Sequence, residues 1–209
     1  SGTPNGSETL TVIPVANSIY DAAGNVASTS QSNNSVSLND KLEPTISSVS
    51  LAANNASIAV TMSEAVYNTN GSSGALQASD FAFSISGGAA TLSSATPSSI
   101  SSSGNVYTLG IGLTGTPNGS ETLTVIPIAN SIYDAAGNVA STSQSNNSVS
   151  LNDKLEPTIS SVSLAANNTT IAVTMSEAVY NTNGGSGALQ ASDFALSISG
   201  GVALSLIHI

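Results

Sequence analysis

The chain has 209 residues, of which 40% are hydrophobic and only 7% are charged, so it carries enough apolar material for folded cores. Twelve acidic residues and two lysines give a net charge of −10, which argues against nucleic acid and anionic membranes as partners. Cysteine is absent, which excludes disulfides and thiolate chemistry, and no apolar run is long enough for a membrane span.

The sequence repeats itself at an offset of 113 residues. Residues 2–90 align without a gap on residues 115–203. The paired positions that differ are Val15/Ile128, Ala56/Thr169, Ser57/Thr170, Ser72/Gly185, Phe83/Leu196 and Ala89/Val202. The stretch Leu-Asn-Asp-Lys-Leu-Glu-Pro at 38–44 returns unchanged at 151–157. We interpret it as the linker of a tandem array, because its proline stops a strand from continuing.

This linker divides the chain into modules. Residues 1–39 are predicted to be the C-terminal part of one module, residues 40–152 a complete module, and residues 153–203 the N-terminal part of a third. We expect the two partial modules to form incomplete sheets with exposed edges, unless they join into one composite domain, which their near-identity to the complete module would permit. The match ends abruptly, and the last residues, 204–209, are similar to a translated sequencing adaptor, so they are left out of the fold prediction. The alternative is that they form a divergent last strand.

Apolar and polar residues alternate through the complete module, which predicts half-buried β-strands. The expected strands are 45–51, 58–62, 81–85, 107–113, 122–125 and 149–151. Clusters of Asn, Gly and Ser between them predict turns, and the one helix-compatible stretch, 75–80, is long enough only for a turn. The period also has the size of an antiparallel sandwich of roughly 100 residues, so we predict an all-β fold.

Three motifs of the complete module resemble the bacterial Ig-like repeats of surface-layer proteins and large adhesins. They are the strand Ile-Ala-Val-Thr-Met-Ser-Glu-Ala-Val at 58–66, the turn Ser-Asp-Phe at 79–81 and the loop Asp-Ala-Ala-Gly-Asn at 134–138. The resemblance covers the whole period. It implies tandem Ig-like or cadherin-like Greek-key β-sandwiches, one complete and two partial. It also implies a location outside the cell or on the bacterial surface. It does not imply an enzymatic activity.

Acidic residues are expected to converge at one pole of the complete module. In an Ig-like sandwich the N-terminus, the end of the second strand and the loop before the last strand share a pole. This predicts a cluster of Asp40, Glu43, Glu64 and Asp134. Calcium takes roughly six to eight oxygen ligands, and the resemblance to cadherin-like repeats implies calcium at this junction. The equivalent residues of the third copy are Asp153, Glu156 and Glu177.

Other interpretations of these acids stay open. Lys41 could pair with one carboxylate while the others are solvated. Asp134 could serve only as a turn residue, because Asp-x-x-Gly-Asn is ordinary turn chemistry. Asp80 and Glu121 are expected to do no more than cap a loop or be solvated.

The sequence does not predict an enzyme. Outside residues 204–209 it has no His, Cys, Arg or Trp, and so lacks the usual general base, thiol nucleophile and guanidinium group. The leading hypothesis is a stalk or spacer segment of a large secreted or surface-anchored bacterial adhesin-like protein. Neighbouring repeats would be its partners, and calcium would stiffen the linkers. The alternatives are a module that binds a glycan or a cell-surface protein, and an accessory spacer of an extracellular enzyme.

Overall fold

The computed structural model describes residues 2–200. The chain divides into two units, Ser1–Lys154 and Leu155–Ile209. The adaptor-like tail at 204–209 and the end of the predicted third module, 201–203, lie outside the described residues. No helix among residues 2–200 is long and apolar enough to cross a lipid bilayer.

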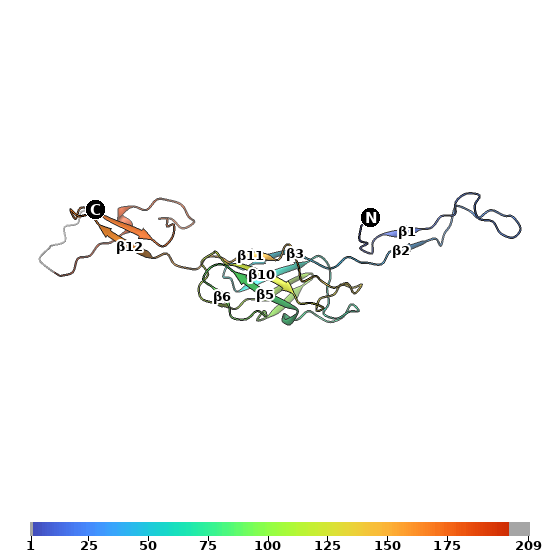
Figure 1. Cartoon of the computed structure of the whole chain (residues 1–209), viewed down its shortest axis with the longest axis horizontal. Coiled ribbons are helices and arrows are strands. Elements are labelled where there is room, and N and C mark those ends of the chain that lie inside the picture. Colours follow the sequence, from blue (N-terminus) through green and yellow to red (C-terminus); the bar gives the residue numbers. More distant parts are fainter. Residues whose placement is uncertain (1, 201–209) are drawn as a thin grey trace. The chain divides into compact units, whose positions relative to one another are not determined.

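Short strands and loops make up the complete module (Figure 1). A single-turn 3-10 helix, η1 (Ala78–Asp80), stands before the third strand of this module. The strands in chain order are β3 (Ile46–Leu51), β4 (Ser57–Met62), β5 (Phe81–Ser86), β6 (Thr91–Leu92), β7 (Ile100–Ser103), β8 (Val106–Gly110), β9 (Leu113–Thr114), β10 (Thr122–Pro127) and β11 (Ser148–Ser150). The all-β prediction is confirmed.

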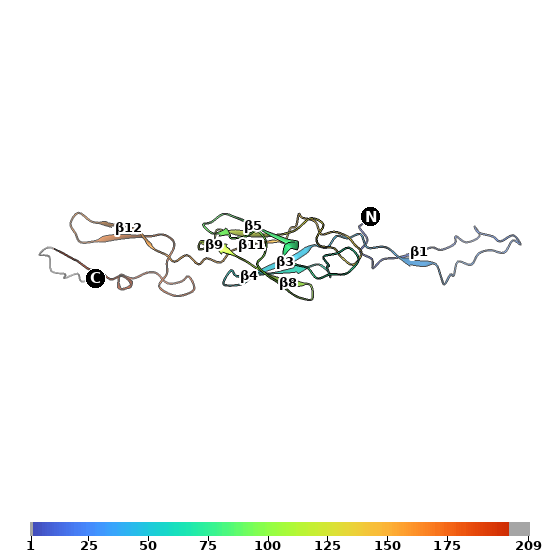
Figure 2. The same cartoon turned by 90° about the horizontal axis from the view of Figure 1, so that it is seen from below.

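Two antiparallel sheets form the body of this module. The first has the order β3-β4-β8-β7 and the second the order β11-β10-β5, while β6 and β9 pair separately. Figure 2 shows β4 and β8 in one layer and β5 and β11 in the other. Residues of both sheets belong to a single hydrophobic core, so the module is a β-sandwich.

The alternation of apolar residues with the residues between them explains why these strands form and which of their faces is buried. Ile58 and Val60 of β4, and Leu123 and Val125 of β10, are completely buried, while the residues between them are half-exposed. Burying one such side chain contributes about 1.5–3 kcal/mol. The apolar face of each strand therefore contributes to stability only when the opposite sheet covers it.

The prediction of one continuous strand over 107–113 is wrong. β8 ends at Gly110, and β9 begins at Leu113 in the separate ladder with β6. Gly112 lies between them, where a β-carbon would stand 2.2 Å from the Ser93 hydroxyl oxygen. The N–H of Ser93 donates to the Gly112 carbonyl at 3.0 Å, and the chain changes sheets there.

Within residues 2–200, each of the other segments forms a two-stranded sheet. Residues 2–39 form a hairpin of β1 (Thr9–Thr11) and β2 (Ser35–Ser37). The second unit contains the pair β12 (Ile159–Leu164) and β13 (Ile171–Met175), followed by η2 (Ala191–Asp193). Large apolar side chains of both segments are exposed.

Candidate metal site

The loop that follows β10 holds Asp134. Its carboxylate is completely buried, and its two oxygens accept hydrogen bonds from the backbone N–H and the side-chain amide of Asn138, each at 2.7 Å. Gly137 between them has φ +89°, a conformation that favours glycine. The Asp-x-x-Gly-Asn motif thus folds as the turn that its residue types predict.

The same loop forms in the N-terminal segment. Asp21 accepts the backbone N–H of Asn25 at 2.8 Å and its side-chain amide at 2.7 Å, although Asp21 is exposed. The turn therefore does not require a surrounding core. What the complete module adds is the burial of Asp134 and the two carboxylates that lie beside it.

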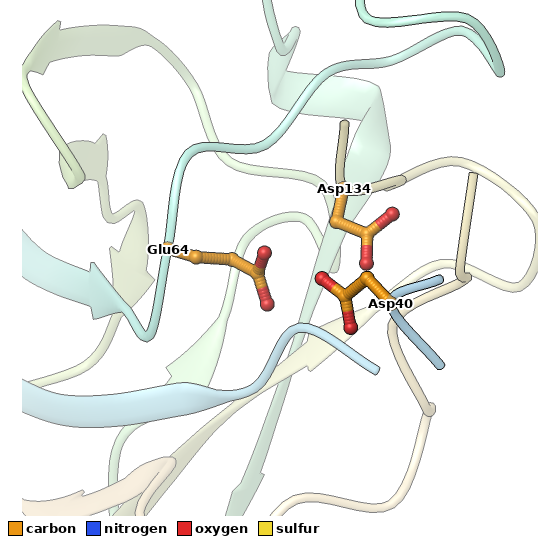
Figure 3. A group of neighbouring side chains, drawn as sticks. All are labelled: Asp40, Glu64 and Asp134. Carbon is orange, nitrogen blue, oxygen red and sulfur yellow. The ribbon is translucent and has the colours of Figure 1, made fainter. Parts of the chain in front are cut away.

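Glu64 is one of these carboxylates and follows β4 closely. Tyr67 and Tyr133 exchange two backbone hydrogen bonds of 2.8 Å, which hold the segment after β4 alongside the Asp134 loop. Glu64 is half-buried there, and its side chain points toward Asp134 (Figure 3).

The linker supplies the third carboxylate, Asp40. Its Oδ1 accepts the N–H of Leu42 at 2.9 Å, and the side-chain amide of Asn138 donates to the Leu42 carbonyl at 3.3 Å. The N–H of Lys41 donates to the carbonyl of Pro4 at 2.9 Å. The linker thus contacts the N-terminal segment through one residue and the Asp134 loop through the next.

Together these elements bring three carboxylates to one place. An oxygen of Asp40, one of Glu64 and one of Asp134 all lie within 4.8 Å of one another, and the three side chains point toward a common centre (Figure 3). Burial raises the pKa of the Glu64 carboxyl, and the negative charges of Asp134 and Asp40 raise this pKa further. Burial and negative charge are the causes of that shift, so the site favours either a proton on Glu64 or a bound cation.

The donor set fits a hard divalent cation. All candidate ligands are oxygens, which calcium prefers over nitrogen or sulfur. Asp134 and Asp40 are already oriented by hydrogen bonds from Asn138 and Leu42, and each oxygen that accepts one such bond keeps a second lone pair. Calcium would supply charge neutralisation and a link between the linker and two loops of the sandwich.

The remaining predicted ligands lie elsewhere. Glu43 is exposed and is not one of the three clustered acids, although it shares the linker with Asp40. In the third copy, Asp153 belongs to the first unit and Glu156 and Glu177 to the second. All three are exposed, and within residues 2–200 none of them belongs to a group of three nearby acids.

Glu121 has one of the two roles expected of it, but in the interior of the module. It is completely buried, and its Oε1 accepts the N–H of Ala89 at 2.8 Å and that of Ala90 at 2.9 Å. It does cap a loop, as expected, but it is not solvated. The signal in the sequence is Gly87-Gly88, which precedes the two alanines and allows the turn around the carboxylate.

No protein-family description matches this sequence, and no curated protein matches it either. Among solved structures, the N-terminal part of the bacterial S-layer protein SbsC is similar at 23% sequence identity and a TM-score of 0.37. The alignment covers 59% of this chain and 26% of that structure. The chain therefore spans about a quarter of the length of the structure that it matches, and a similarity at this level identifies no family.

Proposed function

We propose that this chain is a stalk or spacer segment of tandem Ig-like repeats from a large secreted or surface-anchored bacterial adhesin-like protein. The partners of each repeat are the neighbouring repeats of the same chain. Calcium at the Asp40–Glu64–Asp134 cluster stiffens the linker. The observation that carries the proposal is the position of Asp40. It lies in the linker, yet its carboxylate meets two carboxylates of the complete module.

The strand order supports the Ig-like part of the proposal. Sheets of order β3-β4-β8-β7 and β11-β10-β5 have the arrangement of strands ABED and CFG in a constant-type immunoglobulin domain, with β6 and β9 as an added ladder. In that fold the module's two ends lie at opposite poles. A tandem array of such modules extends from pole to pole, as a spacer requires.

The repeat itself supports a mechanical role. Modules that are nearly identical in sequence can be added or removed without redesigning the contact between neighbours. The scarcity of His, Cys, Arg and Trp favours a non-enzymatic role, because the usual acid–base and nucleophilic groups are missing.

Thermal unfolding of the 209-residue chain, with calcium and with a chelator, tests whether the three-carboxylate cluster binds calcium. Calcium at about 100 times Kd should add about 2.7 kcal/mol of stability, which raises the Tm by several degrees. Glu64→Gln should abolish this increase. In chelator the same variant should be at least as stable as the parent, because the repulsion among the three carboxylates is relieved.

The matched control is Glu43→Gln, which removes an exposed linker carboxylate and should leave the calcium response intact. A Tm difference below about 1 °C between calcium and chelator in the parent protein would refute the calcium-stiffened linker. Equal loss of the response in both variants would indicate diffuse charge screening in place of a defined site.

A further inference from the structure

Strand β7 forms one edge of the first sheet of the complete module. The strand order β3-β4-β8-β7 leaves β7 with β8 as its one strand partner among residues 2–200. Its sequence is Ile-Ser-Ser-Ser, and its three serines are exposed. An edge strand presents backbone N–H and C=O groups to any other strand that approaches it.

The pairing of β7 with β8 decides which backbone groups point to this edge. The carbonyl of Ser99 accepts the N–H of Gly110 at 3.0 Å. Hydrogen-bonded and non-hydrogen-bonded pairs alternate along an antiparallel ladder, so Ser101 also bonds to β8. The backbone groups of Ile100 and Ser102 therefore point away from β8, toward the open edge.

The other three edges of the two sheets are covered. In β5, the N–H of Phe83 donates to the carbonyl of Ala95 at 2.7 Å. At the start of β3, the N–H of Ile46 donates to the side chain of Gln144 at 2.8 Å. β3 also packs against β11, the edge strand of the second sheet. Within residues 2–200, no segment covers β7 in this way.

The exposed surface of residues 65–152 carries no charge that would protect this edge. The charged residues of this range are Asp80, Glu121 and Asp134, and all three are buried. Proteins commonly protect an edge strand with a lysine or a proline, and β7 contains neither. Although the chain has a net charge of −10, no exposed charge of residues 65–152 opposes the approach of a second copy.

We propose that two copies of this chain associate through β7, so that their first sheets form one continuous sheet. The two β7 strands pair antiparallel about a two-fold axis at Ser101. This axis sets Ile100 of each copy opposite Ser102 of the other. These are the residues whose backbone groups point to the edge, so each such pair exchanges two main-chain hydrogen bonds. The contact is an isologous form of β-strand addition.

The chemistry of the edge favours a second copy over an unrelated strand. At the axis, Ser101 meets its own equivalent, and two small neutral side chains can lie there without repulsion. The serines offer neither a charge nor an apolar pocket that would select the side chains of another protein. In the tandem array proposed above, each module would present this edge, and weak contacts between two arrays would act together.

Hydrogen exchange of the full chain at about 10 µM and at about 1 mM measures the association. The N–H groups of Ile100 and Ser102 should exchange at least about twofold more slowly in the concentrated sample, because at least half of the chains are then paired. The N–H of Ser101 is the internal reference, since it bonds to β8 whether or not a second copy is present.

Cysteine cross-linking tests the register, and the absence of native cysteine makes an introduced thiol specific. Ser101→Cys places two thiols opposite one another in a non-hydrogen-bonded pair, where the Cα atoms lie about 4.5 Å apart and within reach of a disulfide. Ser103→Cys is the control on the same strand, because the axis sets Ser103 opposite Ser99. Under mild oxidation, Ser101→Cys should form the covalent dimer at least about fivefold faster than Ser103→Cys.

A charge at the axis tests the same contact without a cross-link. Ser101→Glu should abolish the concentration-dependent protection of Ile100 and Ser102, because two like charges then lie directly opposite one another. Thr108→Glu is the charge-matched control. Thr108 lies opposite Ser101 on β8 and is also exposed, but it is one strand away from the edge, so the protection should persist.

Three outcomes would overturn the proposal. They are unchanged exchange of Ile100 and Ser102 between the two concentrations, equal behaviour of Ser101→Glu and Thr108→Glu, and cross-linking of Ser103→Cys as fast as that of Ser101→Cys. Thermal unfolding in dilute solution shows whether each glutamate variant is folded, and the cysteine pair decides if one is not. None of these measurements involves calcium, so they leave the proposed function to its own test.

Discussion

At the scale of single residues, Glu121 organises the interior turn of the complete module. Its buried carboxylate accepts N–H groups of Ala89, Ala90 and Asn118. Desolvation raises the pKa of Glu121, but these backbone hydrogen bonds together lower it more, so its pKa lies below the ordinary value of 4.5. The ionised form is therefore the one that the folded module stabilises.

We expect Glu121→Ala to lower the free energy of unfolding by about 3 kcal/mol or more, because two interior N–H groups lose their acceptor. Glu8→Ala is the control. Glu8 is the same residue in the N-terminal segment, where it is exposed, and its removal should cost less than about 0.5 kcal/mol. Urea unfolding monitored by circular dichroism measures both values, and equal losses would contradict the assigned role.

The same residue predicts a pH dependence of stability. Because the pKa of Glu121 is depressed in the folded state, its contribution is complete above its unfolded-state pKa near 4.5 and is lost as the pH falls through the lower folded-state pKa. The parent chain should therefore lose more stability than Glu121→Gln between neutral pH and strong acid. Parallel pH profiles would show that other carboxylates govern acid unfolding.

At the scale of elements, the turn between β5 and β6 depends on two glycines. Gly87 and Gly88 have φ +77° and +62°, and a β-carbon on Gly88 would stand 2.1 Å from the carboxyl carbon of Glu121. The turn thus needs both the left-handed backbone and the space that a missing side chain leaves. Gly104, in the turn between β7 and β8, has φ +58° but nothing within 4 Å of its β-carbon position.

A comparison of Gly88 with Gly104 separates the cost of backbone strain from the cost of a steric clash. We expect Gly104→Ala to cost about 1–2 kcal/mol, which is the strain of a left-handed alanine. Gly88→Ala should cost about 2 kcal/mol more, because it also displaces the Glu121 carboxylate. Chemical unfolding of both variants measures the difference. Similar losses would mean that the carboxylate moves aside freely.

The strands differ in how well the sequence predicts them, for a physical reason. β4, β5 and β10 bury one face and leave the other partly exposed, so the alternation of apolar and polar residues reveals them. β7 (Ile100–Ser103) is mostly exposed and serine-rich, and β6 is only Thr91–Leu92. Such strands form because a neighbouring strand supplies the backbone hydrogen bonds. Their own residues show no alternation of apolar and polar side chains from which they could be predicted.

The sequence predicted only those features of the candidate metal site that follow from the strand topology. The resemblance to Ig-like repeats predicts that Glu64, Asp134 and the linker share a pole, and the structure gathers Asp40 with the first two. The exposure of Glu43 was not predictable, because spacing within a linker does not decide which side chain turns inward. The burial of Glu121 was not predictable, because its partners Ala89 and Ala90 are about thirty residues away in sequence.

At the scale of the whole molecule, the complete module holds its linkers at both ends. At its start, Leu42 accepts a hydrogen bond from Asn138. At its end, Asn55 binds Asn152: the Asn55 amide donates to the Asn152 carbonyl at 2.8 Å, and the Asn55 Oδ1 accepts the Asn152 N–H at 2.9 Å. Lys154 then donates its N–H to Pro117 at 2.8 Å. These contacts constrain the linker without any metal.

Asn55 also has φ +60°, so Asn55→Gly keeps the backbone conformation and removes only the side-chain bonds. We expect the Asn152 N–H to exchange with solvent about tenfold faster in this variant, since the loss of one buried hydrogen bond costs about 1.4 kcal/mol. Asn168→Gly is the control, because Asn168 is the repeat equivalent, with φ +58°, and lies in the second unit. Hydrogen exchange in chelator measures the effect apart from calcium. Unchanged protection of Asn152 would show that the Asn55 side chain does not hold this second linker.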